Sequence, residues 1–250
     1  MLQLFNCAVD IGEQMLISGA EVYRVEESIN RMCNAFGAKR VDVFIITSSM
    51  VVTVYTEDGN TLTQTRRVTS TKYDIEKLHT LNNLCREICK TKMSAQEVEA
   101  RLEAARSCKK FPLWLELVSS AAIAGAFTYF FGGGFAETIV SLVVGAIVWG
   151  CSLFVDKILP NKIFSKFCAS AIATLLAFLT VRFGWIPSID KVVIGNVMTS
   201  IPGIGLTNAI RDLFSGDNIA GLLRLIDAML TALAIAAGYY LIAVLGGFAV

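Results

Sequence analysis

A set of polar and charged side chains lies in the apolar C-terminal part of the chain, on both sides of an interruption at Pro202-Gly203. A guanidinium group recognises a carboxylate through paired hydrogen bonds, and an aspartate in a poorly hydrated cavity titrates closer to neutral pH. These residue types predict a substrate site, in which an anionic substrate is one candidate partner for the arginines and an aspartate could carry a proton. The expected binding residues are Asn196, Thr199, Ser200, Pro202, Gly203, Asn208, Arg211 and Arg224, and the expected proton carriers are Asp212 and Asp227.

The segment that holds these residues, 189–214, is long enough to cross a membrane but contains the proline and glycine of the interruption. Proline removes a backbone donor and glycine tolerates unusual dihedral angles. A break at mid-depth must line a cavity or be buried in protein, because lipid cannot satisfy the freed backbone groups. Discontinuous helices of this kind mark substrate sites in transporters. The alternative is a kinked packing helix whose hydroxyl groups are already satisfied.

Charge is divided unevenly along the chain. Residues 1–112 carry 29 of the 43 Asp, Glu, Lys and Arg residues, although mean hydropathy over the whole chain is +0.60. Charged groups in hydrocarbon are expensive. The composition therefore predicts a water-soluble domain at 1–112, followed by an all-α membrane domain at 113–250.

Five membrane spans are expected from the apolar runs, at about 113–131, 135–155, 163–181, 189–214 and 219–245. Small residues step by four along several of them, as in Ser165, Ala169, Ala173 and Ala177, which favours close helix packing. With the N-terminal domain inside, the inner connections receive seven basic residues and the outer ones two, in line with the positive-inside rule. The inner set is Lys109, Lys110, Lys157, Lys162, Lys166, Arg211 and Arg224; the outer set is Arg182 and Lys191.

The N-terminal domain is expected to be a small α+β domain. Residues 1–36 show helical periodicity, either as one bent helix or as two short ones. Three antiparallel strands are expected between residues 41 and 68, with Asp58-Gly59 as a two-residue hairpin, and helices at about 74–90 and 95–107. Capping boxes are expected to begin at Ser18 and Ser94.

No catalytic or metal-binding constellation is visible in this domain. The chain has one histidine, His79, and its seven cysteines follow no zinc or disulfide framework. The neighbouring acids Glu26 and Glu27 are expected on a solvated face, and Glu21 with Arg24 in a surface ion pair. We therefore expect neither enzymatic activity nor a cofactor.

Two motifs resemble the threonine/serine exporter family. One is Ser18–Glu26, and the other is Pro202–Asp217 followed by Gly221. The resemblance covers nearly the whole chain and implies a cytosolic domain followed by five spans. It further implies the larger subunit of a split exporter of the succinate-exporter type, working with a shorter all-membrane partner. Split members are linked to small carboxylates such as succinate, and fused members to threonine and serine.

The leading hypothesis is thus a subunit of an inner-membrane exporter driven by the proton motive force, paired with that partner or with itself. ATP coupling is not expected, because the sequence has no P-loop. A net charge of +1 gives no reason to expect a nucleic-acid partner. A membrane-anchored sensor or scaffold, with the N-terminal domain as its working part, is the alternative. An intramembrane enzyme ranks last.

Overall fold

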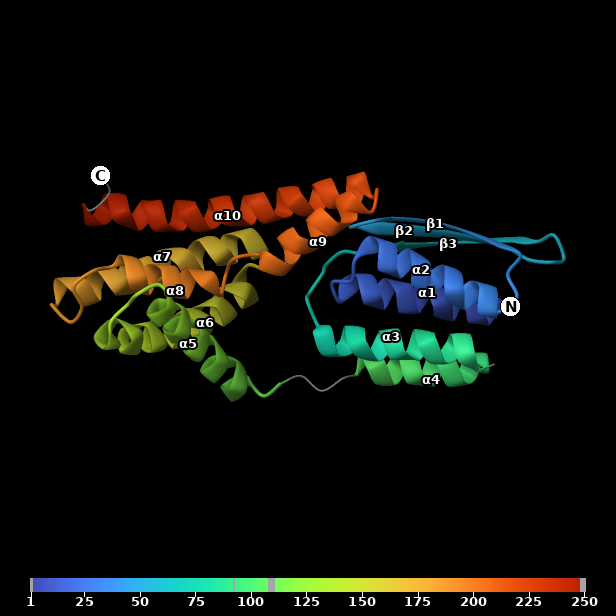
Figure 1. The fold of residues 1–250 in the computed structure, drawn as a ribbon, viewed down its shortest axis with the longest axis horizontal. Helices are drawn as coiled ribbons and strands as arrows, with labels where there is room; N and C mark the ends of the chain where they lie inside the picture. Colours follow the sequence, from blue (N-terminus) through green and yellow to red (C-terminus); the bar gives the residue numbers. More distant parts are fainter. Residues whose placement is uncertain (1, 92, 108–110, 248–250) are drawn as a thin grey trace. The chain divides into compact units, whose positions relative to one another are not determined.

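The computed structural model describes residues 2–91, 93–107 and 111–247 (Figure 1). The chain forms two compact units. One combines residues 1–109 with 205–225, and the other combines residues 110–204 with 226–250. Residues 205–225, which the composition assigns to the membrane domain, are therefore packed as part of the N-terminal unit.

The N-terminal unit begins with two helices, α1 (Leu2–Ile17) and α2 (Val22–Ala35), so the two-helix alternative is the one observed. The turn between them needs Gly19, whose φ is +89°, and a side chain there would collide with the Tyr73 ring. The capping box expected to begin at Ser18 is wrong. Ser18 follows the end of α1, while the residue before α2 is Glu21, whose side chain makes no capping bond.

A three-stranded antiparallel sheet follows, in the order β1 (Arg40–Ile46), β2 (Ser49–Tyr55) and β3 (Thr61–Arg67). The two-residue hairpin joins β1 to β2, because Ile46 pairs with Ser49. The hairpin expected at Asp58-Gly59 is wrong in length. The Thr56 amide donates to the Asn60 carbonyl and closes a longer loop, in which Gly59 has a φ of +80°.

Two helices, α3 (Ile75–Lys90) and α4 (Ala95–Arg106), complete the N-terminal part of this unit. The Ser94 hydroxyl accepts a hydrogen bond from the Glu97 amide, which confirms the helix start expected there. Apolar side chains of helices α1 to α4 and of β2 form one buried core. Its largest members are Phe5, Ile11, Met15, Leu16, Ile29, Met32, Met50 and Leu81.

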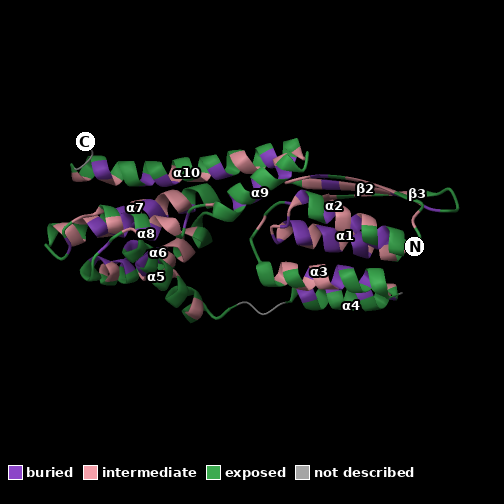
Figure 2. Cartoon of the chain, in the orientation of Figure 1, coloured by how far each residue is buried: buried purple, intermediate pink, exposed green. Residues whose placement is uncertain are grey.

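Among the described residues, four helices are long and apolar enough to cross a membrane: α5 (Leu113–Phe130), α6 (Phe135–Ile158), α7 (Lys162–Arg182) and α10 (Asn218–Gly246). The expected break is also present. Helix α8 (Asp190–Met198) ends before it, and α9 (Gly203–Phe214) begins after it. Counted together as a broken span, this pair brings the candidate spans among the described residues to five. Most of the surface of α10 is exposed (Figure 2).

Glycine and alanine let the helices of the second unit approach closely. Ser165, Ala169, Ala173 and Ala177 of α7 are all buried, as their spacing predicts. A Cβ atom at Gly195 of α8 would lie 2.0 Å from the Thr128 hydroxyl and 2.7 Å from the Ala124 carbonyl of α5. Backbone-to-backbone packing of this kind is a main source of helix association in membranes.

Gly195→Ala should destabilise the second unit. The added methyl group has no room against α5, and overpacking of this kind costs about 1–3 kcal/mol. We expect a lower unfolding temperature of the purified chain in detergent. Gly150→Ala in α6 is the matched control, because nothing lies within 4 Å of a Cβ atom there. Equal unfolding temperatures for the two variants would contradict this packing.

Candidate functional site

The turn between α1 and α2 binds helix α9 through polar groups of both. The Val22 amide donates to Asp212 Oδ1 at 3.2 Å, and Asn208 Nδ2 donates to the Gly19 carbonyl at 3.1 Å. These bonds join residues about 190 positions apart in sequence. We call the set Gly19, Ala20, Glu21, Val22, Asn208, Arg211, Asp212 and Arg224 the turn cluster.

Arg224, near the start of α10, completes the turn cluster. It donates through Nη2 to the Ala20 carbonyl at 2.7 Å, and its Nε lies 3.3 Å from Asp212 Oδ2. The side chain of Asp212 is 1% exposed and that of Arg224 is 11% exposed. Asp212 Oδ2 makes no hydrogen bond. The charge of Arg224, which lies at ion-pair distance, compensates the charge of this carboxylate. Removing one partner of such a pair leaves a buried charge uncompensated.

Arg211 is engaged more loosely. It forms an ion pair with Glu21, and Glu21 also lies 3.6 Å from Arg24, so the predicted Glu21–Arg24 pair is present and shared. Arg211 is 58% exposed, whereas Glu21 is 19% exposed. Exposed pairs contribute little to stability. The Arg211 guanidinium can therefore exchange Glu21 for another carboxylate at small cost.

Helix α9 has its polar face buried and its large apolar side chains exposed. Gly205, Asn208, Ala209 and Asp212 are buried within the N-terminal unit. The exposed side chains are Ile204, Leu206, Ile210 and Phe214. This is the reverse of a helix on the surface of a water-soluble protein. It suits a half-helix that places its apolar side against lipid or another apolar surface.

The glycines of the second motif shape the approach of α10 to α9. Gly216 has a φ of +94°, which turns the chain after α9. A Cβ atom at Gly221 would lie 2.7 Å from Leu213 Cγ and 2.9 Å from the Ala209 carbonyl. This close packing places Arg224, one turn further along α10, against Asp212.

Glu26 of α2 is a functional candidate that the sequence analysis missed, and its expected place on a solvated face is wrong. Burial, the charge of Asp217 and then that of Asp212 raise the pKa of Glu26 to about 7, against a hydrogen bond from the backbone of Ile45. The signal was available in the helical spacing. Glu26 lies between Val22 and Ile29 at intervals of four and three, on the edge of the buried face.

A second polar group lies inside the unit that holds α5, α6 and α8. The Thr128 and Ser141 hydroxyls are 2.7 Å apart, and Asn196 Nδ2 donates to Ser141 Oγ at 2.9 Å. All three side chains are buried, and Asn196 Oδ1 has no hydrogen-bond partner. We call Thr128, Ser141 and Asn196 the buried triad. The sequence analysis predicted Asn196 and missed both hydroxyl residues, which carry no charge and lie in unbroken spans.

The other predicted site residues are distributed as follows. The Thr199 hydroxyl bonds to the Asn196 carbonyl at 2.8 Å, and Ser200 is buried beside it in the chain. Pro202 and Gly203 lie at the start of α9. Asp227 is exposed on α10 and makes no ion pair with any residue that the structure describes. The structure thus joins Asp212 and Arg224 directly, and brings Asn208 to the same turn through Gly19 and Arg211 through Glu21.

The described residues give little support for metal binding or for chemistry at a thiol. Among them, no group of three His, Cys, Asp or Glu residues could hold a metal ion. Burial raises the pKa of Cys33 to about 12 and contributes most to raising that of Cys85 to about 11, so both thiols are protonated near neutral pH. The sites described above can bind and exchange protons, and they show no nucleophile.

Comparison with known proteins identifies relatives along nearly the full length. A "Probable succinate transporter subunit YjjP" from Klebsiella aerogenes is 25% identical over 231 residues, covering 90% of this chain and 86% of the relative. A protein of the same description from Escherichia coli K12 is 24% identical, covering 92% and 90%. A "Probable threonine/serine exporter" from Mycobacterium tuberculosis is 22% identical, covering 94% of this chain but 45% of the relative.

No solved structure matches the chain at a significant level. The family model described as "Putative threonine/serine exporter" matches residues 6–246. This range includes both motifs, whose residues meet in the turn cluster. The family and the relatives named above are transporters and not enzymes. The chain belongs to the threonine/serine exporter family.

Proposed function

We propose that this chain is one subunit of a secondary-active exporter of small carboxylates, a succinate-like dicarboxylate or threonine and serine. The observation that carries the proposal is the turn cluster, because the buried Asp212–Arg224 ion pair joins the helix after the break to α10, and hydrogen bonds from both residues join it to the turn between α1 and α2. A plain anchor would need only an apolar helix. The proposed protein crosses the inner membrane several times, with the N-terminal domain in the cytoplasm. Two of the seven basic residues that support this orientation, Lys109 and Lys110, lie outside the described residues.

A shorter all-membrane partner would complete the exporter. Two relatives are described as subunits, and the M. tuberculosis relative is about twice as long as this chain's match to it. The exposed apolar surface of α10 offers room for such a partner. Self-association is the alternative way to complete the assembly.

In the proposed mechanism, Arg211 binds the substrate carboxylate. It is the more exposed arginine of the turn cluster, and its present partner Glu21 is itself a carboxylate. A substrate would replace that carboxylate with one of the same charge, as paired guanidinium recognition allows. Within the second unit, the buried triad, with the unpartnered Asn196 Oδ1, offers a separate set of uncharged groups for the substrate.

Asp212 and Arg224 have a different role in this mechanism. Their ion pair and the Val22 amide hold α9 to the turn between α1 and α2. Protonation of Asp212 would remove the charge that Arg224 compensates and weaken that attachment. Release and return of α9 would then follow proton binding, which gives the coupling that a secondary transporter requires. Asp227 stays a second candidate for the proton.

Arg211→Gln should abolish export while the protein remains abundant. The variant loses the charge that binds the substrate but breaks only an exposed ion pair. The measurement is succinate, threonine and serine release from cells that coexpress the partner, normalised to protein in the membrane. Arg101→Gln in α4 is the control, since Arg101 also belongs to exposed ion pairs with Glu87 and Glu97. Full export by Arg211→Gln at normal abundance would refute this role.

Arg224→Gln should lower abundance, because it leaves the Asp212 carboxylate buried without compensation, at a cost of about 3–5 kcal/mol. Adding Asp212→Asn removes that charge and should restore much of the abundance. Export should stay absent in the double variant, because no proton-sensitive ion pair remains. Recovery of export together with abundance would show that the pair serves folding alone, as the sensor or scaffold alternative requires.

Stability of the N-terminal unit should fall as pH rises from about 5 to 8. The pKa of Glu26 is raised from 4.5 to about 7 in the folded chain, so folding favours its protonated form. That contribution is complete below the unfolded pKa and is lost as pH rises through the folded value. As pH rises, the unfolding temperature in detergent should therefore fall less for Glu26→Gln than for wild type. Glu57→Gln, in the β2–β3 loop, should behave as wild type; equal slopes for wild type and Glu26→Gln would contradict this account.

A further inference from the structure

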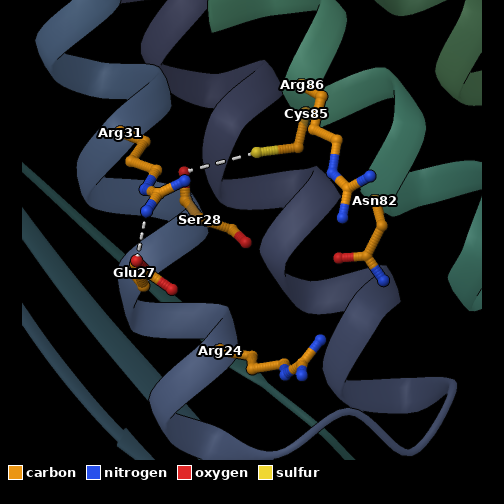
Figure 3. Close-up of a pocket in the computed structure, with 7 residues that line it drawn as sticks. All are labelled: Arg24, Glu27, Ser28, Arg31, Asn82, Cys85 and Arg86. Atoms are coloured by element: carbon orange, nitrogen blue, oxygen red, sulfur yellow. Dashed lines mark hydrogen bonds and ion pairs between the residues drawn. The ribbon is translucent and has the colours of Figure 1, made fainter.

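A small pocket opens between α2 and α3 in the N-terminal unit (Figure 3), and none of its lining residues is a member of the turn cluster. Its volume is about 100 Å³. At ~30 Å³ for each water in the liquid, this is room for about three waters or one small organic ion. Arg24, Glu27 and Arg31 enter its lining from α2, and Asn82 and Arg86 enter from α3.

The lining is strongly cationic. Three guanidinium groups face one carboxylate, that of Glu27. Glu27 is already paired with Arg31, while Arg86 makes no ion pair with any described residue. Because Arg24 is paired with Glu21 and Arg31 with Glu27, Arg86 has the charge that an anion in the pocket would compensate. The amide group of Asn82 adds a hydrogen-bonding side chain to the same lining.

The inner wall of the pocket is inert. Cys85 donates its thiol to the Ser28 carbonyl at 3.7 Å, which ties α3 to α2. Mainly through burial, the pKa of this thiol is raised to about 11, so it stays protonated and is no nucleophile near neutral pH. The pocket therefore has the groups to bind an anion and lacks the groups to transform it.

We propose that this pocket is a binding site for a small free anion with several oxygen acceptors, such as a dicarboxylate or inorganic phosphate. Arg31 and Arg86 bind its oxygens from the two helices, and Asn82 donates a further hydrogen bond. Guanidinium groups suit such anions because their donors form a planar fork that matches paired oxygens. The site is separate from the export path and does not depend on the export function proposed above.

Occupancy of the pocket would be sensed by the turn cluster. Arg24 lines the pocket and also lies 3.6 Å from Glu21, which in turn is paired with Arg211. An anion that draws Arg24 toward the pocket leaves Glu21 to Arg211 alone. The anion would then change the ion pairing of Arg211, so it would regulate the protein rather than be transported from this site.

The test is calorimetric titration of the purified full chain in detergent with succinate, with inorganic phosphate and with neutral succinamide. We expect saturable binding of at least one of the two anions and none of succinamide. Arg86→Gln should weaken binding at least about tenfold, the loss expected for one charge-assisted hydrogen bond. Arg67→Gln removes the same charge from an exposed position on β3 and should leave affinity unchanged.

Glu27→Gln gives a result of opposite sign. It removes the carboxylate that competes with the ligand for Arg31, so anion affinity should rise, a gain that misfolding cannot produce. Arg211→Gln should keep pocket binding even where export is lost, which separates this site from the export path. Absence of saturable binding of both anions, or equal affinity for wild type and Arg86→Gln, would overturn the proposal.

Discussion

The amino end of α2 is capped by a side chain from α9. Helix ends leave backbone donors without intrahelical partners, and Glu21, in the capping position, does not supply one. Asp212 binds the Val22 amide instead and brings a negative charge to a helix terminus that favours one. Because this carboxylate is buried, it needs Arg224, and Arg224 in turn binds the Ala20 carbonyl. One carboxylate therefore fixes the positions of a turn, a half-helix and the start of the last span.

The second unit is stabilised by interactions of a different kind. Its helices carry few charges, and their contacts depend on glycines that permit close approach and on hydroxyl and amide groups that satisfy one another. Such contacts hold neighbouring helices without the cost of burying ions in hydrocarbon. The unsatisfied Asn196 Oδ1 is the exception within the buried triad. In a transporter, an acceptor without a protein partner is a natural contact for a donor on the transported molecule.

Local patterns predicted much of the architecture. Hydropathy located the four long apolar helices and the interrupted segment, because each signal lies within one stretch of sequence. Ser94 predicted its helix start for the same reason. Ser18 misled because its motif has the right spacing, whereas Gly19 imposes a turn and Tyr73 packs on it. Asp58-Gly59 does lie in a hairpin loop, but in a longer one, and the two-residue loop at Thr47-Ser48 lacks the glycine that usually marks such a turn.

The site itself was predictable only in part. Residue type identified Arg211, Asp212 and Arg224 as unusual charges in an apolar region. Asp212 and Arg224 bind backbone groups of Val22 and Ala20 as well as each other, and no side-chain property marks a backbone carbonyl or amide as a ligand. Helical spacing could have marked Glu26 as partly buried, and burial is the largest cause of its raised pKa, but the further contributions of Asp217 and Asp212 come from residues about 190 positions away. Sequence separation of this size conceals contacts that folding brings together.

The dependence of the first unit on residues 205–225 has a consequence for biosynthesis. Ala220 is part of the same buried core as Phe5, so this core, like the cap of α2, is incomplete until the ribosome has made the start of α10. At ~5–20 residues per second, the interval between residue 109 and residue 225 is on the order of ten seconds. The domain at residues 1–109 therefore matures only after the start of α10 has been made. A nascent chain that stops before α10 exposes an unfinished core and an uncapped helix, which quality-control proteases can recognise.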